Sequence, residues 1–223
     1  MPIKKLPWYK SVQAVLRKDL MCEYRNRYTA GTVCMFALIT LSSISISIGG
    51  MRLTPALAAV LLWVIIFFSA MAGLSRSFVQ EQETGTLFTL RVYAGAQAVL
   101  FGKLVFNMLI LIGLTALIVP LFTLFFDMEV KSWSMLIGVL LLGSTGITAA
   151  ATLTAAIAAE SEGKGALFTV LTFPVILPLF LMAIRATDTI FDGLLPELSQ
   201  IVFLAGYDVT VVVVASILFD FLW

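Results

Sequence analysis

Six long apolar runs set the strongest limit on what this chain can fold into. They are Gly31–Ile48, Pro55–Leu74, Leu104–Phe126, Met135–Ala159, Ala166–Ile184 and Ile201–Trp223. A hydrocarbon layer about 30 Å thick needs roughly 20 residues of helix to cross it, and each run is close to that length. Backbone polar groups in lipid must be satisfied within the segment, so we expect six transmembrane helices. At 61% hydrophobic and 12% charged residues, the sequence also lacks the polar surface of a soluble domain.

The region before the first run has a different pattern. Between residues 8 and 28, Trp8, Val12, Val15, Leu16 and Leu20 recur at steps of three and four. This spacing predicts an amphipathic helix lying in the membrane interface. Such a helix is compatible with a simple anchor and equally with a contact to a cytoplasmic subunit. With no repeat and no linker, residues 1–223 are expected to form one all-α integral membrane domain.

The basic residues predict the orientation. Lys4, Lys5, Lys10, Arg17, Lys18, Arg25 and Arg27 precede the first run, and Arg76, Arg91, Lys103 and Lys164 fall in loops on the same side. Arg52, Lys131 and Arg185 fall on the opposite side. Eleven of the 14 basic residues therefore share one side, which the positive-inside rule assigns to the cytoplasm. Both termini are expected there.

Several kinds of catalytic and metal site are absent from the sequence. The chain has no histidine, which removes Ser-His and Cys-His pairs and the commonest haem and zinc ligand. Neither Gly-Lys pair has the spacing of a phosphate-binding loop. Cys22 and Cys34 form no CxxC pair, so no disulfide is expected. We therefore expect no enzymatic activity from this chain alone and no directly bound metal or cofactor.

Three intramembrane residues stand out as polar or hinge positions. Asp208 is the one ionisable residue well inside an apolar run, and such residues usually face protein or water. Its depth depends on where the sixth helix begins. Pro174 and Pro178 each remove a helix hydrogen bond, so we expect a kink or a broken helix there. The fourth run is rich in small residues, which predicts either the most tightly packed helix or a subunit interface.

The segment 78–103 is polar and punctuated by glycine, unlike its surroundings. Gly85 suits a left-handed helix end and Thr86 suits the cap of a following helix. The turn 93–95 then leads to Gly102 and Lys103 before the third span. A short helix, a break and a second short helix on one side of the membrane would suit a groove on a cytoplasmic ATPase.

The order of residues here resembles type-2 ABC exporter membrane subunits, and most closely the haem exporter protein B family of cytochrome c maturation. The matching residues are Arg76, Phe78, Glu81, Glu83, Gly85, Thr86, Leu87, Gly102, Lys103 and Asn107. Further matches are Asp19, Leu20, Glu23 and Arg25, then residues 141–144, 163–165 and 171–178. The resemblance covers essentially the whole chain. It departs at residues 93–95, where the family commonly has a proline.

This resemblance implies a function and a set of contacts. The chain would be the permease-type subunit of an ABC complex in the bacterial inner membrane, and its partner ATPase would hydrolyse the ATP. Hydrolysis would drive haem handling and the release of a haem-loaded periplasmic chaperone. Other cytochrome c maturation membrane proteins would be further partners of the chain. The implied ATPase-coupling residues are Phe78, Glu81, Glu83, Gly85, Thr86, Leu87, Leu90, Arg91, Glu160, Glu162 and Lys164. The alternatives are a type-2 permease for lipid-linked saccharide or drug, and a non-transporting scaffold.

Overall fold

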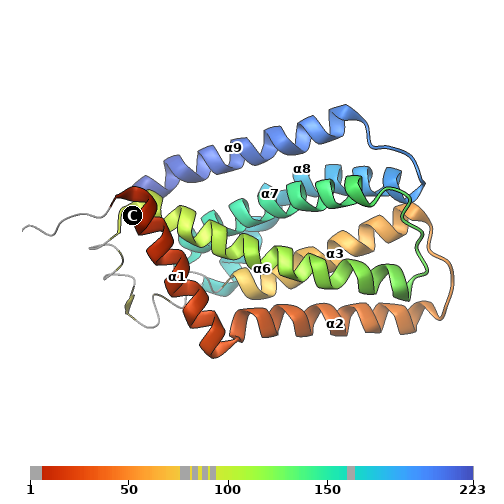
Figure 1. Ribbon diagram of the computed structural model, residues 1–223, viewed down its shortest axis with the longest axis horizontal. Coiled ribbons are helices and arrows are strands. Elements are labelled where there is room, and N and C mark those ends of the chain that lie inside the picture. Colours follow the sequence, from red (N-terminus) through yellow and green to blue (C-terminus); the bar gives the residue numbers. More distant parts are fainter. Residues whose placement is uncertain are drawn as a thin grey trace, which may run out of the picture.

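Seven helices form the described part of the chain, and they lie in one bundle (Figure 1). The computed structural model describes residues 7–75, 81, 85–86, 90, 94–159 and 164–222. The helices are α1 (Trp8–Asn26), α2 (Tyr28–Ile48), α3 (Pro55–Leu74), α6 (Ala96–Phe125), α7 (Trp133–Ala159), α8 (Lys164–Phe191) and α9 (Leu198–Leu222). All but α1 are long and apolar enough to cross a membrane, so the prediction of an all-α membrane protein with six spans is confirmed.

The helix bounds differ from the predicted spans mainly at their ends. The third span was expected from residue 104, but α6 begins at Ala96. Likewise α8 continues to Phe191, beyond the expected end at residue 184. Hydropathy marks where a helix is in hydrocarbon, whereas the helix itself continues into the interface for as long as its backbone hydrogen bonds can form.

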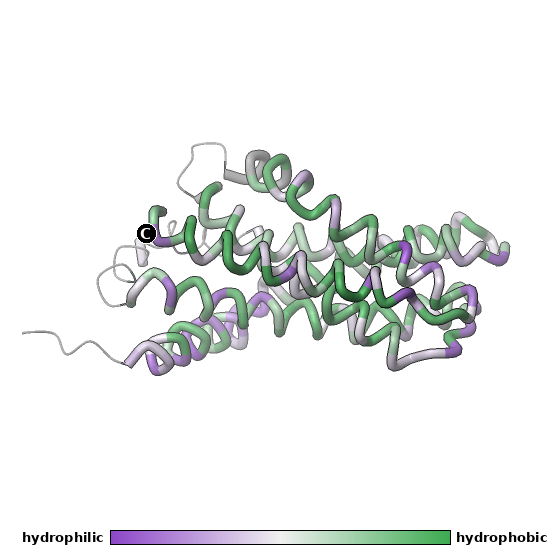
Figure 2. Tube along the Cα trace, turned by 90° about the horizontal axis from the view of Figure 1, so that it is seen from above, coloured by the Kyte–Doolittle hydropathy of each residue, from purple (hydrophilic) through white to green (hydrophobic). Residues whose placement is uncertain are grey.

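Helix α1 crosses one end of the bundle at a steep angle to the spans (Figure 1). Hydrophilic and hydrophobic residues are mixed along it, while hydrophobic residues dominate the spans (Figure 2). Its apolar side rests on α6, where Trp8 meets Phe101 edge-on with ring centroids 5.8 Å apart. A Cβ atom on Gly102 would lie 2.7 Å from Val15 Cγ1, so the glycine is what allows this close crossing. The predicted amphipathic helix is confirmed.

A single residue separates α1 from α2. Arg27 has φ +51°, in the left-handed region that ends a helix, and its backbone N–H donates to Glu23 O. The Glu23 side chain then accepts a hydrogen bond from the backbone N–H of Ala30, at 2.7 Å from Oε1. That bond satisfies one of the free donors in the first turn of α2. Glu23 therefore helps to set the angle between the interfacial helix and the first span.

Helix α7 is the most buried of the six spans, which confirms the prediction of a tightly packed fourth helix. Its small residues allow α3 to approach, and a Cβ on Gly143 would lie 2.1 Å from the Trp63 ring. Trp63 in turn donates from Nε1 to Thr187 Oγ1 of α8 at 2.8 Å. A buried indole N–H needs such a partner. Together these contacts join α3, α7 and α8 into the core of the bundle.

Candidate functional site

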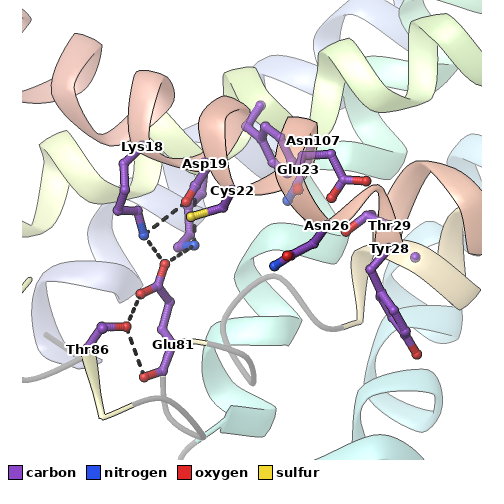
Figure 3. Close-up of a pocket in the computed structure, with 13 residues that line it drawn as sticks. Lys18, Asp19, Cys22, Glu23, Asn26, Tyr28, Thr29, Glu81, Thr86 and Asn107 are labelled. Atoms are coloured by element: carbon purple, nitrogen blue, oxygen red, sulfur yellow. Dashed lines mark hydrogen bonds and ion pairs between the residues drawn. The ribbon is translucent and has the colours of Figure 1, made fainter.

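Glu81 is the centre of a cluster of buried and partly buried charges at the α1 end of the bundle (Figure 3). Its side chain lies inward, and the residue is only 7% exposed. One carboxylate oxygen, Oε1, pairs with Lys18 of α1 and with Lys103 of α6, the latter at 3.2 Å. Glu81 therefore connects the segment between α3 and α6 to two helices that are distant from each other in the sequence.

Asp19 completes the cluster. Its Oδ1 lies 2.9 Å from Lys18 Nζ and its Oδ2 lies 3.3 Å from Lys103 Nζ. Lys103 is 2% exposed, so its ammonium group would be very costly to bury without these carboxylates. Two lysines and two carboxylates balance one another, and we define Lys18, Asp19, Glu81 and Lys103 as the ion cluster.

The ion cluster shifts the ionisation of its members. Burial alone would raise the pKa of Glu81, but the Lys103 charge and hydrogen bonds from Lys18 and Thr86 lower the pKa to about 2. Burial alone would lower the pKa of Lys18, but the neighbouring Asp19 and Glu81 carboxylates outweigh it and the pKa is raised. Each shift favours the charged form, so the attraction between these groups exceeds the cost of their burial.

Gly85 lies in a backbone turn near Glu81, and Thr86 follows it in helical conformation. Gly85 has φ +69°, the left-handed conformation that the sequence predicted at this break. The Thr86 hydroxyl donates to the Glu81 carboxylate and, at 3.3 Å, to the Glu81 backbone oxygen. The turn therefore holds the carboxylate in place for its lysine partners. The prediction that Thr86 caps a following helix stays a prediction, because residues 87–89 lie outside the described part of the chain.

A cavity of about 270 Å³ lies beside the ion cluster, where α1, α2, α3 and α6 meet (Figure 3). Its walls carry the four ion-cluster residues together with Cys22, Glu23, Asn26, Tyr28, Thr29, Gly73, Thr86, Phe106 and Asn107. Asn107 stands one helical turn beyond Lys103 on α6 and is 1% exposed. The cavity thus has charged groups at the ion cluster and an amide deeper along α6.

The Asn107 amide has one of its two polar atoms satisfied. Its Nδ2 donates to Thr152 Oγ1 of α7 at 2.9 Å, and the Thr152 hydroxyl donates to Thr148 O at 2.7 Å. Because Thr152 gives its single hydrogen to Thr148, it can only accept from Asn107, which fixes the orientation of the amide. Asn107 Oδ1 is then buried with no hydrogen-bond donor among the described residues.

Asp208 lies in a separate place, inside α9. It is the eleventh residue of a 25-residue helix, so at 1.5 Å per residue it is about 15 Å from the start of the helix and near its middle. The carboxylate packs against α7 and α8, because a Cβ on Gly146 would lie 2.5 Å from Asp208 Oδ1 and 2.7 Å from Leu179 Cδ2. Both of its oxygens are buried with no hydrogen-bond partner within the part of the chain that the structure describes.

The two prolines lie on the exposed side of α8. The helix runs unbroken through Pro174 and Pro178, so a broken helix, one of the two alternatives that the sequence suggested, is not observed. The Tyr207 hydroxyl of α9 donates to the backbone oxygen of Val175, between the two prolines. This bond ties α9 to the proline-bearing turn of α8, one residue from Asp208.

The predicted ATPase contact is described only in part. Leu90 is partly buried against the hydrophobic core, and Lys164 begins α8. Phe78, Glu83, Leu87, Arg91, Glu160 and Glu162 lie outside the described residues. The coupling surface as a whole stays a prediction.

Sequence reasoning did not identify the ion cluster as a unit. Lys103 was counted as a loop charge, and Asp19 and Asn107 were noted for their resemblance alone. The available signal was the four-residue spacing of Lys103 and Asn107 at the start of an apolar run, which puts both on one helix face. Within the described residues, no group of three or more acidic or cysteine side chains is placed to hold a metal ion.

Comparison with known proteins assigns the family. A search of curated proteins gave no match. The family model described as CcmB protein matches residues 10–220, nearly the whole chain, including all but the first two residues of α1, the ion cluster and Asp208. Because this match covers nearly the whole chain, and the chain has six apolar spans, it belongs to the CcmB protein family of membrane subunits for haem export and cytochrome c maturation.

Proposed function

We propose that this chain couples ATP hydrolysis by a separate cytoplasmic ATPase to haem handling and to release of a haem-loaded periplasmic chaperone. The chain itself supplies no catalytic group, and its sequence has no phosphate-binding loop. Family membership supports a permease subunit within a larger complex. ATP would be bound by the partner, and haem would be cargo of the complex.

The observation that carries this proposal is the attachment of Glu81 to two helices. A segment that receives force from a partner must be connected rigidly to the part that moves. Glu81 is paired with Lys18 on α1 and with Lys103 on α6; the Lys103 pair is buried and the Lys18 pair is partly buried. Displacement of the segment by an ATPase would therefore act directly on the interfacial helix and on the third span.

The charge distribution supports the side on which this happens. The α1 end of the bundle carries the ion cluster, and the chain terminus at α9 also lies there (Figure 1). The loop assignment made from the sequence puts 11 of the 14 basic residues on this side, which supports a cytoplasmic location for both termini in the bacterial inner membrane. The other cytochrome c maturation proteins and the chaperone would then contact the spans and the opposite face.

Gene deletion with complementation tests the function. Deletion should abolish c-type cytochromes while haem-loaded chaperone accumulates, and the wild-type gene should restore both. Normal c-type cytochrome levels in the deletion strain would contradict the proposal and favour a permease for another substrate.

A charge swap tests the mechanical role of Glu81. Glu81→Lys places three cations around Asp19 and should uncouple the complex, with ATPase activity no longer leading to chaperone release. The double variant Glu81→Lys with Lys103→Glu restores two cations and two carboxylates, and we expect it to recover release. Reconstituted complexes, checked for equal ATPase retention by pull-down, provide the measurement. If Glu81→Lys releases chaperone at the wild-type rate, the ion cluster does not transmit the coupling.

A further inference from the structure

We propose that the outward side of α1 binds the phosphate groups of anionic phospholipids, through Lys10, Arg17 and Arg25. These three residues are called the basic row below. The lipids are those of the leaflet that surrounds the α1 end of the bundle. The proposal goes beyond the coupling of the chain to an ATPase and does not depend on it.

Helix α1 leaves most of its surface uncovered by the rest of the described chain. It packs mainly against α6 and lies on the outside of the bundle near one end (Figures 1 and 2). Val15 and Asp19 face α6 and are 4% and 8% exposed. The basic row lies away from α6, and all three of its residues are exposed. The row is therefore accessible to a ligand from outside the chain.

The members of the basic row are regularly spaced. They follow one another at steps of seven and eight residues, about two helical turns each, so they lie on one side of α1. At 1.5 Å per residue the row extends over about 22 Å. A row of this length suits a charged surface better than a single small anion.

The charges of α1 are separated across the helix. Its two acidic residues, Asp19 and Glu23, are engaged on the side of the bundle. Asp19 pairs with Lys18 and Lys103, and Glu23 accepts a hydrogen bond from the first turn of α2. In the part of the chain that the structure describes, no ion pair joins the basic row to a carboxylate. The outward side of α1 thus carries positive charge that these residues do not balance.

A hollow of about 610 Å³ lies along the basic row. Its described walls carry all three members of the row together with Gln13, Ala14, Lys18, Met21 and Cys22. Among these described walls there are four cations and no carboxylate. Lysine and arginine form charge-assisted hydrogen bonds with phosphate oxygens. The hollow therefore has the chemistry of a site for phosphate groups.

Exposed apolar side chains beside the basic row favour a lipid as the source of the phosphate. Tyr9, Leu20 and Tyr24 are 55%, 41% and 78% exposed. Tyrosine is enriched at headgroup depth, and basic residues beside apolar ones are typical of a helix that lies in the membrane interface. Helix α1 crosses the end of the spans, where that interface begins (Figure 1). An anionic phospholipid offers phosphate to the cations and hydrocarbon to the apolar side chains in one molecule.

Lipid retention by the full chain in nanodiscs tests the proposal. The discs contain equal amounts of dioleoylphosphatidylcholine and dioleoylphosphatidylglycerol, and native mass spectrometry counts each lipid retained after transfer to detergent. Each lysine or arginine near an anionic surface contributes about a fivefold preference, so we expect the anionic lipid to be retained at least about fivefold more. Equal retention of the two lipids would overturn the proposal.

Two triple variants connect the preference to the basic row. Lys10→Gln, Arg17→Gln and Arg25→Gln together remove the charge of the row, and we expect them to lower the preference at least about fivefold. The matched control removes three exposed cations toward the opposite end of the bundle, with Arg52→Gln, Lys131→Gln and Arg185→Gln. These cations lie on separate elements and form no row, so the control should keep the wild-type preference. Equal losses in both triple variants would show that the preference follows net charge alone and would overturn the proposal.

Further variants separate charge from folding and from a protein partner. Lys10→Arg with Arg17→Lys and Arg25→Lys keeps all three charges and should keep the preference. Arg17→Gln alone should lower it about fivefold, which keeps the test decisive if the triple glutamine variant folds poorly. A triple glutamine variant that keeps the full preference but no longer co-purifies with an ATPase would overturn the proposal and assign the basic row to an acidic protein surface.

Discussion

Glu81 and Asp208 are both buried carboxylates, 7% and 6% exposed, but their surroundings differ in kind. Glu81 lies at the end of the bundle against two lysines and a threonine hydroxyl. Asp208 lies near the middle of α9 with a glycine and a leucine against it, and neither of its oxygens has a hydrogen-bond partner among the described residues. The Glu81 carboxylate is therefore held by opposite charges, whereas the contacts described for the Asp208 carboxylate are van der Waals packing.

The difference shows two ways in which a small membrane protein keeps polar groups inside. At the interface, the long side chains of lysine can reach from different elements to a shared carboxylate, and the resulting pairs fix the positions of those elements. In the middle of the spans, glycine makes room for a polar group but supplies no partner. We therefore expect the ion cluster to determine stability, whereas Asp208 contributes little to it.

The largest expected effect comes from removing a lysine. Lys103→Met keeps the length of the side chain but leaves Asp19 and Glu81 with Lys18 as their one cation in the ion cluster. Breaking a buried pair in this way costs about 3–5 kcal/mol of unfolding free energy. Reversible denaturation in mixed micelles measures the loss. Lys10→Met, on the exposed side of α1, should stay within about 0.5 kcal/mol of the wild type. A loss of unfolding free energy in Lys103→Met as small as that of the control would contradict the expected role of the ion cluster in stability.

Acidification should reduce the contribution of Glu81 to the unfolding free energy. The pKa of Glu81 is lowered from 4.5 to about 2, so its stabilising effect is complete above pH 4.5 and is lost as the pH falls toward 2. The shift corresponds to at most about 3 kcal/mol. Unfolding free energies measured from pH 5 to pH 2 should therefore fall more steeply for the wild type than for Glu81→Gln. Glu197→Gln, an exposed control, should keep the wild-type slope, and a parallel decline for all three proteins would contradict the expected contribution of Glu81.

The smallest effect is expected at Asp208. Asparagine has the same shape, and Asp208 has no described partner to lose, so Asp208→Asn should change the unfolding free energy by no more than about 1 kcal/mol. Asp19→Asn is the matched variant in the ion cluster and should cost more, because it removes a carboxylate that pairs with both Lys18 and Lys103. Equal losses in the two variants, measured in the same micelles, would show that Asp208 has a charged partner after all.

The fold could be predicted from the sequence because lipid leaves few options. Continuous apolar runs must be helices, and all six spans are confirmed. The small residues of α7 indicated its close packing because they let neighbouring helices approach, and the Trp63 ring does lie against Gly143. The ends of α6 and α8 could not be read from hydropathy, because the interface accepts both helix and polar side chains.

The site was less predictable. Gly85 was identified from its residue type, because glycine is favoured where φ is positive. The pairing of Glu81 with Lys18 and Lys103 could not be derived, because it joins residues 63 and 22 positions apart and depends on the angle at which α1 crosses α6. That angle is set by Gly102 and Arg27 together, through packing and a left-handed backbone, and no pattern of charges encodes it.

The sequence distances within the ion cluster also dictate an order of events during synthesis. Asp19 leaves the ribosome 84 residues before Lys103, which at roughly 5–20 residues per second is a delay of about 4–17 s. Glu81 is made 22 residues before Lys103, and the two spans α2 and α3 must be made before Lys103, the last member of the ion cluster, is added. The N-terminal helix can therefore complete its ion pairs only after the start of the third span has been made. Formation of the ion cluster thus depends on the earlier synthesis and insertion of the first two spans.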